Sequence, residues 1–199
     1  MLLTTTVAIE ATLGPRELKR AYWYELDEVL PPHVPLLALA LGHSATELAS
    51  WSAHPERVAG FGYLGPFGDV ELVEFAPGLQ TGVEAVRAAV AFLRGLGKEV
   101  AVVGDPPGQV LPRILAMLIN EAAFALAEGI AEAADIDTAM RLGVNYPRGP
   151  LEWADAIGLD RVVATLDGLH AHYGEDRYRV APHLRRMLLA GRSLRGSGA

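Results

Sequence analysis

Few side chains in this sequence can do metal or acid–base chemistry. The chain has six histidines and no cysteine, so neither a thiolate nucleophile nor a disulfide is available. The histidines are scattered without the spacing of metal ligands, and His170 and His172 are too close in sequence for an i, i+4 pair. We therefore expect no bound metal. General-base chemistry also needs a group that titrates near pH 7 within hydrogen-bond reach of the reacting proton.

His43 and Glu74 are two of the side chains able to accept a proton. His43 stands in the loop after a predicted strand, and Glu74 stands near the end of another. A loop histidine is usually only solvated. A lone glutamate at a strand end usually caps an element or pairs with a cation. The residue types alone favour these plainer readings for both side chains.

The composition indicates a globular, acidic chain. It has 199 residues, of which 51% are hydrophobic and 21% charged, enough for one large domain or two small ones. The formal net charge of −7 argues against nucleic acid, because phosphate binding needs clustered Lys and Arg. No apolar run reaches the ~18 residues of a membrane span, and residues 1–4 lack the basic start of a signal peptide. We expect a cytoplasmic protein without a membrane partner.

Strands and helices alternate through the first part of the chain. The predicted strands are 2–11, 34–41, 57–63, 70–75 and 99–103, and the predicted helices are 15–30, a short one capped by Ser44, and 81–96. This alternation favours an α/β layer architecture. The Asp-Pro-Pro-Gly stretch at 105–108 then breaks the pattern, which predicts one domain over 1–105 and another over 106–199.

The second part is predicted to be all helical. A long apolar helix covers 110–128, and Gly129 can end it because glycine adopts the left-handed conformation at low cost. Asp135 or Asp137 can cap the next helix by accepting a hydrogen bond from a free backbone N–H. Gly143 is predicted to end that helix.

Short stretches in a recognisable order run through most of the chain. They include Thr-Glu-Leu-Ala at 46–49, His-Pro-Glu-Arg-Val at 54–58, Leu-Val-Glu at 72–74, Leu-Ile-Asn-Glu-Ala at 118–122, Pro-Arg-Gly-Pro-Leu-Glu at 147–152, Gly-Leu-Asp at 158–160 and Pro-His-Leu at 182–184. The later stretches resemble the C-terminal helical domain of the 3-hydroxyacyl-CoA dehydrogenases. The earlier ones resemble the second part of that family's NAD-binding domain. The form Asn-Tyr-Pro-Arg-Gly-Pro at 145–150 is most similar to the bacterial enzymes of phenylacetate degradation.

The resemblance implies a particular chemistry. That family oxidises a 3-hydroxyl to a ketone and passes the hydride to NAD. A histidine takes the hydroxyl proton, a glutamate orients it, and a serine and an asparagine bind the reacting oxygen. The histidine position aligns with Gly62, and the asparagine position with Pro112. The serine falls in the Ala-Leu-Gly stretch at 40–42, beside which His43 is a possible substitute base. Only Glu74 is retained.

The family's first βαβ unit has no counterpart in this sequence. That unit contains a Gly-x-Gly-x-x-Gly turn, where the pyrophosphate of NAD meets a helix N-terminus. We find no such motif, and the glycines at 62, 65, 68, 95 and 97 are more simply read as turns. We therefore expect the isolated chain to bind no cofactor, although the family uses NAD.

These observations together predict an α/β domain followed by an all-α domain: a truncated Rossmann-like half-sheet plus the family's helical domain. We expect an N-terminally shortened, catalytically impaired relative that serves as an acyl-CoA-binding or assembly member. One alternative is an active NAD-dependent dehydrogenase completed by another chain. A second alternative is a purely structural dimer. In each case we expect a homodimer, because an apolar strand over 2–9 would otherwise be left as an open sheet edge.

Overall fold

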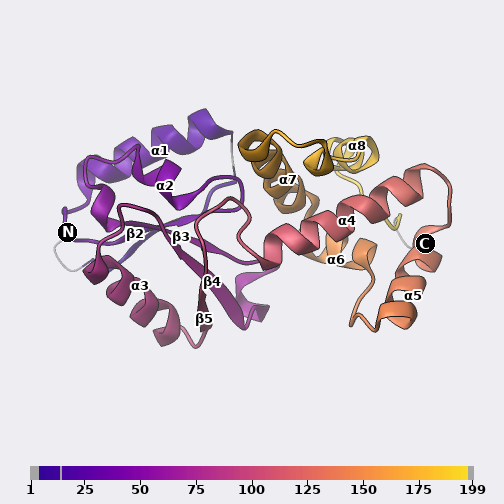
Figure 1. Cartoon of the computed structure of the whole chain (residues 1–199), viewed down its shortest axis with the longest axis horizontal. Helices are drawn as coiled ribbons and strands as arrows, with labels where there is room; N and C mark the ends of the chain where they lie inside the picture. The colour runs from indigo at the N-terminus through magenta and orange to yellow at the C-terminus, as the bar shows by residue number, and fades with distance from the viewer. Residues whose placement is uncertain (1–4, 14, 197–199) are drawn as a thin grey trace.

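The computed structural model describes residues 5–13 and 15–196 and divides into a sheet-containing part and a helical part (Figure 1). The strands are β1 Ala8–Glu10, β2 Leu36–Leu39, β3 Val58–Gly62, β4 Leu72–Pro77 and β5 Glu99–Val102. The helices are α1 Arg16–Val29, α2 Ala45–Ala49, α3 Val83–Gly95, α4 Leu111–Ala127, α5 Ala133–Val144, α6 Pro150–Ile157, α7 Leu159–Tyr173 and α8 Pro182–Ala190. Short 3-10 helices cover Pro55–Arg57, Phe67–Asp69 and Asp176–Tyr178. The predicted α/β part followed by an all-α part is confirmed.

The five strands form one sheet in the order β1-β2-β3-β4-β5. All neighbours are parallel except β3 and β4, which pair antiparallel. The first strand is much shorter than the predicted 2–11, and residues 2–4 of that prediction lie outside the described residues. Sequential order with parallel pairing places the carboxyl ends of β1, β2 and β3 along the same edge of the sheet.

Strand β2 is apolar along its whole length because both faces of the sheet are covered. Its alternate residues point to opposite faces, as the period of two requires. Leu36 belongs to the core under α1 and α2, which contains Trp23, whereas Leu37 belongs to the core on the other face, which contains Leu93 of α3. Figure 1 shows α1 and α2 on one face and α3 on the other. Helices on both faces hold the sheet and the loops at its carboxyl edge in place.

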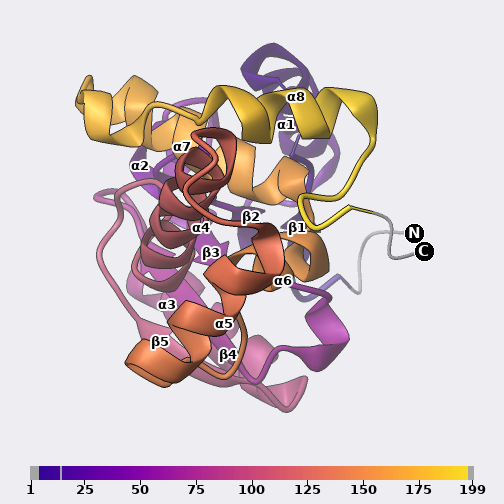
Figure 2. The ribbon, with the colours of Figure 1, turned by 90° about the vertical axis from the view of Figure 1, so that its right-hand side faces the viewer.

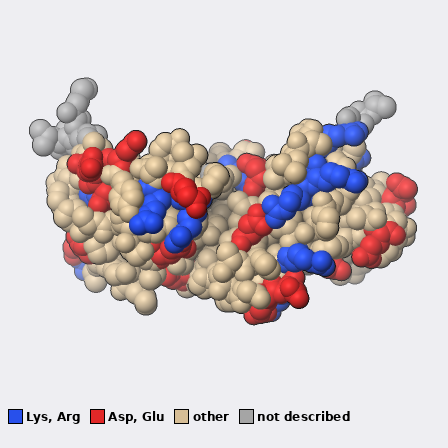
Figure 3. Space-filling view, turned by 90° about the horizontal axis from the view of Figure 1, so that it is seen from above, with Lys and Arg blue, Asp and Glu red and all other residues tan. Residues whose placement is uncertain are grey.

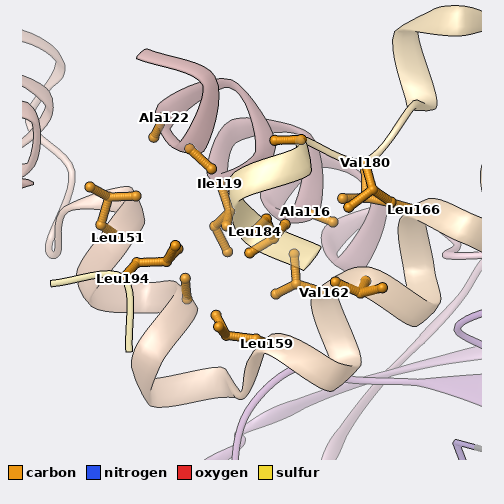
Figure 4. Packing of buried hydrophobic residues seen from close by; sticks show 14 of the residues in the cluster. Ala116, Ile119, Ala122, Leu151, Leu159, Val162, Leu166, Val180, Leu184 and Leu194 are labelled. Atoms are coloured by element: carbon orange, nitrogen blue, oxygen red, sulfur yellow. The ribbon is translucent and has the colours of Figure 1, made fainter. Parts of the chain in front are cut away.

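In the helical part, α4 packs against α6, α7 and α8 (Figure 2). Its buried face includes Ala116 and Ile119, which lie opposite Leu166 of α7 and Leu184 of α8 in one core (Figure 4). Asn120, on the same helix, is buried and bridges to the α8 side. Its side chain donates to the carbonyl of Arg179 at 2.9 Å and accepts from the N–H of Ala181 at 2.8 Å. The long helix thus anchors the rest of the helical domain.

Two of the helix-end predictions need correction. Gly129 follows α4 with φ 70° and is confirmed as its terminator. Gly143 was expected to end α5 but lies inside it, and Asn145 adopts the left-handed conformation with φ 57° instead. Asp135 does not cap α5, because it lies inside that helix, which starts at Ala133 after Glu132. Asp137 does not cap α5 either. It lies within that helix, and its carboxylate accepts from the N–H of Leu151 at 2.8 Å, so it caps α6 instead. Asparagine tolerates the left-handed region better than other residues with a Cβ, and a carboxylate caps whichever helix start it can reach.

A buried ion pair ties α1 to the start of β3. Arg57 is fully buried, and its guanidinium donates to the Asp27 carboxylate at 2.6 Å. Burial by itself would raise the pKa of Asp27. Hydrogen bonds from the Ser52 hydroxyl, the Ala53 N–H and Arg57 outweigh burial and hold this pKa below its ordinary value of 3.8. A depressed folded-state pKa adds stability above the unfolded pKa, and this stability is lost as the pH falls through the folded pKa.

We therefore expect Asp27→Asn to lower the free energy of unfolding by about 1–3 kcal/mol at neutral pH. The difference in the free energy of unfolding between the wild type and the variant should shrink as the pH falls below 3.8. Urea unfolding across this range measures the gap. Glu28→Gln, an exposed change on the same helix, is the matched control and should show little effect. A gap that does not vary with pH would contradict the assignment.

Candidate ligand site at the junction of the domains

Two carboxylates hold the segment that crosses from the sheet to the helices. At its start, Asp105 accepts from the N–H of Thr46 at 3.1 Å and so helps to cap α2. At its end, Glu74 accepts from the N–H groups of Val110 and Leu111, at 2.9 Å each. Glu74 is buried and caps α4, which is the plainer role considered for it. Its catalytic role stays a prediction, because a carboxylate with two backbone donors is still able to orient a base.

Between these two carboxylates, Gln109 turns its side chain back toward β3. It is 4% exposed, and its backbone is left-handed with φ 48°, which is uncommon for a residue with a Cβ. A Cβ placed on Gly62 would lie 1.9 Å from the Oε1 of Gln109 and 2.8 Å from its Cδ. The carboxamide therefore fills the space that a side chain at position 62 would need. Neither its oxygen nor its nitrogen has a hydrogen-bond partner among the described residues.

The other aligned positions also carry groups without acid–base function. Pro112 is buried in the first turn of α4, where proline removes no helical hydrogen bond. Gly42, in the stretch aligned with the serine, touches α7: a Cβ on Gly168 would lie 2.4 Å from the Gly42 Cα. Sheet and helices therefore meet backbone to backbone at this point.

A cleft of about 470 Å³ lies beside this contact, at the carboxyl ends of β1 and β2. Residues from α1, α7, α8 and the loops after β1 and β2 line it, and Figure 3 looks onto this side of the molecule, where acidic and basic side chains stand side by side. Lys19 in the wall is 1% exposed, and its ammonium group contacts the buried carboxylate of Glu10. Asp160 and Asp167 of α7 also line the cleft. The cleft is therefore lined by both acidic and basic side chains.

His43 also lines this cleft, whereas Glu74 does not. The His43 Nδ1 lies 3.2 Å from a carboxylate oxygen of Glu47, and its ring packs edge-on against Trp51. The hydrogen bond with His43 is the largest of the causes that lower the pKa of Glu47. The structure does not bring the two proposed catalytic residues into contact with each other, and the role of His43 as a substitute base stays a prediction.

The expectation that the sequence lacks a Gly-x-Gly-x-x-Gly spacing was wrong in one literal respect. Gly60, Gly62 and Gly65 have that spacing. The first two lie inside β3 and only a short 3-10 helix follows, so no helix N-terminus is presented to a phosphate. Gly60 instead allows α2 to approach, because a Cβ there would lie 3.2 Å from that of Ala45.

The loop after β1 does not fit the pyrophosphate of a dinucleotide either. After β1 the chain enters α1 through Pro15, which has no N–H to donate. The Lys19 ammonium is already occupied by Glu10 and by the carbonyl of Thr12. Strand β4 leads through Gly78 and Gly82 into α3, but these two glycines lack the Gly-x-Gly-x-x-Gly spacing. We derive no hydride-transfer step from residues 5–13 and 15–196.

The described residues also show no group of three His, Asp or Glu side chains able to hold a metal ion. None of the helices described is long and apolar enough to cross a membrane.

A mostly parallel sheet covered on both faces, with a cleft at the carboxyl ends of its strands and a helical domain behind it, defines a two-domain protein of the Rossmann-like class. Residues 1–106 match the 3-hydroxyacyl-CoA dehydrogenase NAD binding domain, and residues 108–199 match the C-terminal domain of the same family. The chain belongs to the 3-hydroxyacyl-CoA dehydrogenase family.

Known relatives are similar over most of this chain. A probable 3-hydroxybutyryl-CoA dehydrogenase of Bacillus subtilis is 37% identical over 185 residues, which are 93% of this chain and 64% of that protein. Another, of Deinococcus radiodurans, is 36% identical over 96% of this chain and 69% of its own length. The crystal structure of (S)-3-hydroxybutyryl-CoA dehydrogenase PaaH1 from Ralstonia eutropha matches with a TM-score of 0.85 and 34% identity, covering 100% of this chain and 72% of that one. The chain thus spans about two thirds of the length of these relatives.

Sequence reasoning did not find Gln109. The available signal was the pairing of a glycine at the aligned base position with a glutamine next to the boundary glycine, Gly108. Nothing in the sequence joins positions 62 and 109, however, because their contact depends on how the crossing segment folds back over β3.

Proposed function

We propose that this chain binds 3-hydroxyacyl or 3-oxoacyl thioesters of coenzyme A and does not oxidise or reduce them with its own residues. The family membership supports the ligand class. The observation that carries the proposal is the neutral site at the end of β3, where Gly62 and the Gln109 carboxamide occupy the aligned base position. An amide does not titrate near pH 7, so it cannot serve as the general base. The likeness to the phenylacetate-degradation type remains part of this proposal.

A second candidate is an NAD-dependent 3-hydroxyacyl-CoA dehydrogenase in which another chain supplies a Gly-rich βαβ unit. The comparisons favour it more than they favour an impaired protein, because each relative described above is named as a dehydrogenase. Strand β1 pairs only with β2 among the described residues, so its other edge can accept a further strand. The first candidate, acyl-CoA binding without catalysis, is supported instead by the residues at the aligned base position of this chain.

A pair of titrations distinguishes the two candidates. The purified chain is expected to bind 3-hydroxybutyryl-CoA by calorimetry, to bind NAD no tighter than millimolar, and to form no NADH when both are present. General acid–base catalysis is worth about 10²–10⁴ in rate, so its absence is readily measured. NADH formation that Glu74→Gln or His43→Ala abolishes would overturn the first candidate and support an active site built on those residues.

We also propose that the chain forms a homodimer. Val110, Leu111 and Ile114 near the start of α4 are each more than 40% exposed, which is unusual for a run of apolar residues on one helix. Ile9 belongs to β1, which pairs only with β2 among the described residues, and it is 44% exposed. Light scattering is expected to give twice the chain mass at micromolar concentration. The exposed change Leu142→Asp on α5 is the control for surface charge alone, and Ile114→Asp should shift the protein toward monomer. A wild-type monomer would contradict the proposal.

A further inference from the structure

Gln109 combines three features that are each unfavourable for folding. Its side chain is almost fully buried, both polar atoms of its carboxamide lack a partner among the described residues, and its backbone is left-handed with φ 48°. A buried amide without hydrogen bonds loses its water contacts and gains nothing in return. Strained and unpaired groups of this kind concentrate at ligand sites.

Its position is held by neighbours on both sides. Glu74 binds the two N–H groups that follow Gln109, at 2.9 Å each, and Asp105 binds α2 four residues before it. The carboxamide is thereby held at the carboxyl end of β3, the edge at which open α/β sheets bind ligands. It occupies the space next to Gly62, where its Oε1 lies 1.9 Å from the position of an added Cβ.

The chemistry of an amide selects what can bind there. It offers two N–H donors and one carbonyl acceptor, and it has no proton to exchange near pH 7. A hydroxyl can donate to its oxygen, and a ketone can accept from its nitrogen. The same side chain therefore accommodates an oxygen in either oxidation state without converting one into the other.

We propose that Gln109 is a ligand-binding residue that hydrogen-bonds the oxygen at C3 of an acyl-CoA thioester. This assignment rests on the proposed function, because it takes the acyl thioester as the ligand class. Both polar atoms are enclosed among the described residues, so binding requires a movement that exposes them.

The test compares two thioesters that differ only in this oxygen. Calorimetry with 3-hydroxybutyryl-CoA and with butyryl-CoA is expected to show about 5- to 10-fold tighter binding of the former, which is the effect of one hydrogen bond. Gln109→Met keeps the length of the side chain and removes both polar atoms. It is expected to abolish the preference for 3-hydroxybutyryl-CoA. Gln80→Met, an exposed substitution of the same kind, is the control and should keep the preference.

The outcomes separate this assignment from the proposed function. If both thioesters bind equally to the wild type, or if Gln109→Met keeps the preference, the chain binds acyl-CoA and the assignment to Gln109 is overturned. If neither thioester binds, both proposals are overturned. Should Gln109→Met fail to fold, the wild-type comparison alone decides, because equal affinities overturn the assignment.

Discussion

Replacing Lys19 by methionine is expected to lower the free energy of unfolding by about 3–5 kcal/mol. Lys19 and Glu10 are 1% and 4% exposed and form a buried ion pair in the wall of the cleft. Burial lowers the pKa of Lys19, and the Glu10 carboxylate opposes that shift. Without the ammonium group, the carboxylate stays buried, and among the described residues only Thr12 donates to it. The loss is large against a typical total stability of about 5–15 kcal/mol.

Removing the charges of both Glu10 and Lys19 should lower the free energy of unfolding less than removing the charge of Lys19 alone. In the double variant Glu10→Gln with Lys19→Met, no net charge remains buried, and the glutamine oxygen can still accept from the N–H of Thr12. Urea unfolding of the wild type, the single variant and the double variant measures the difference. If Lys19→Met unfolds at the wild-type midpoint, the pair does not stabilise the fold. Equal losses in the single and double variants would show that the unpaired charge is not the cause.

Adding one methyl group at Gly168 is expected to destabilise the protein by about 1–3 kcal/mol or more. The new Cβ would lie 2.4 Å from both the Cα and the carbonyl oxygen of Gly42, so α7 or the loop after β2 must move. The contacted atoms belong to the backbone, which cannot move aside as easily as the end of a flexible side chain. The change should also widen the junction beside the cleft, since Gly42 and Gly168 both line it.

The same substitution at another helical glycine should have the opposite sign. Gly143 lies in α5 with no atom within 4 Å of an added Cβ. Alanine there is expected to stabilise the protein by about 0.5–1 kcal/mol, because glycine loses more backbone freedom on folding. Thermal unfolding of the two variants side by side measures both effects. Stabilisation by Gly168→Ala would show that the backbone contact between the domains is loose.

Local patterns were sufficient to predict most of the elements. The apolar run at 34–41 predicts a strand buried on both faces, and β2 is one. Ser44 caps α2 by accepting from the N–H of Glu47 at 3.0 Å, as its capping pattern indicates. Gly129 ends α4. These features depend on neighbours a few residues away, so the order of residues carries the information. The aligned site positions, Gly62 among them, could likewise be located from the order of the matched stretches.

The sequence by itself therefore determined the two-part architecture, the family resemblance and the absence of a titratable base at Gly62. Only the tertiary structure decided what occupies the space that this glycine leaves, and it is the side chain of Gln109, which reaches back to β3. It also decided that Asp137 caps α6 and not its own helix. The reason is physical. A cap or a space-filling side chain acts on whatever lies within a few ångströms, and that neighbour is set by how the elements pack and not by their distance along the chain.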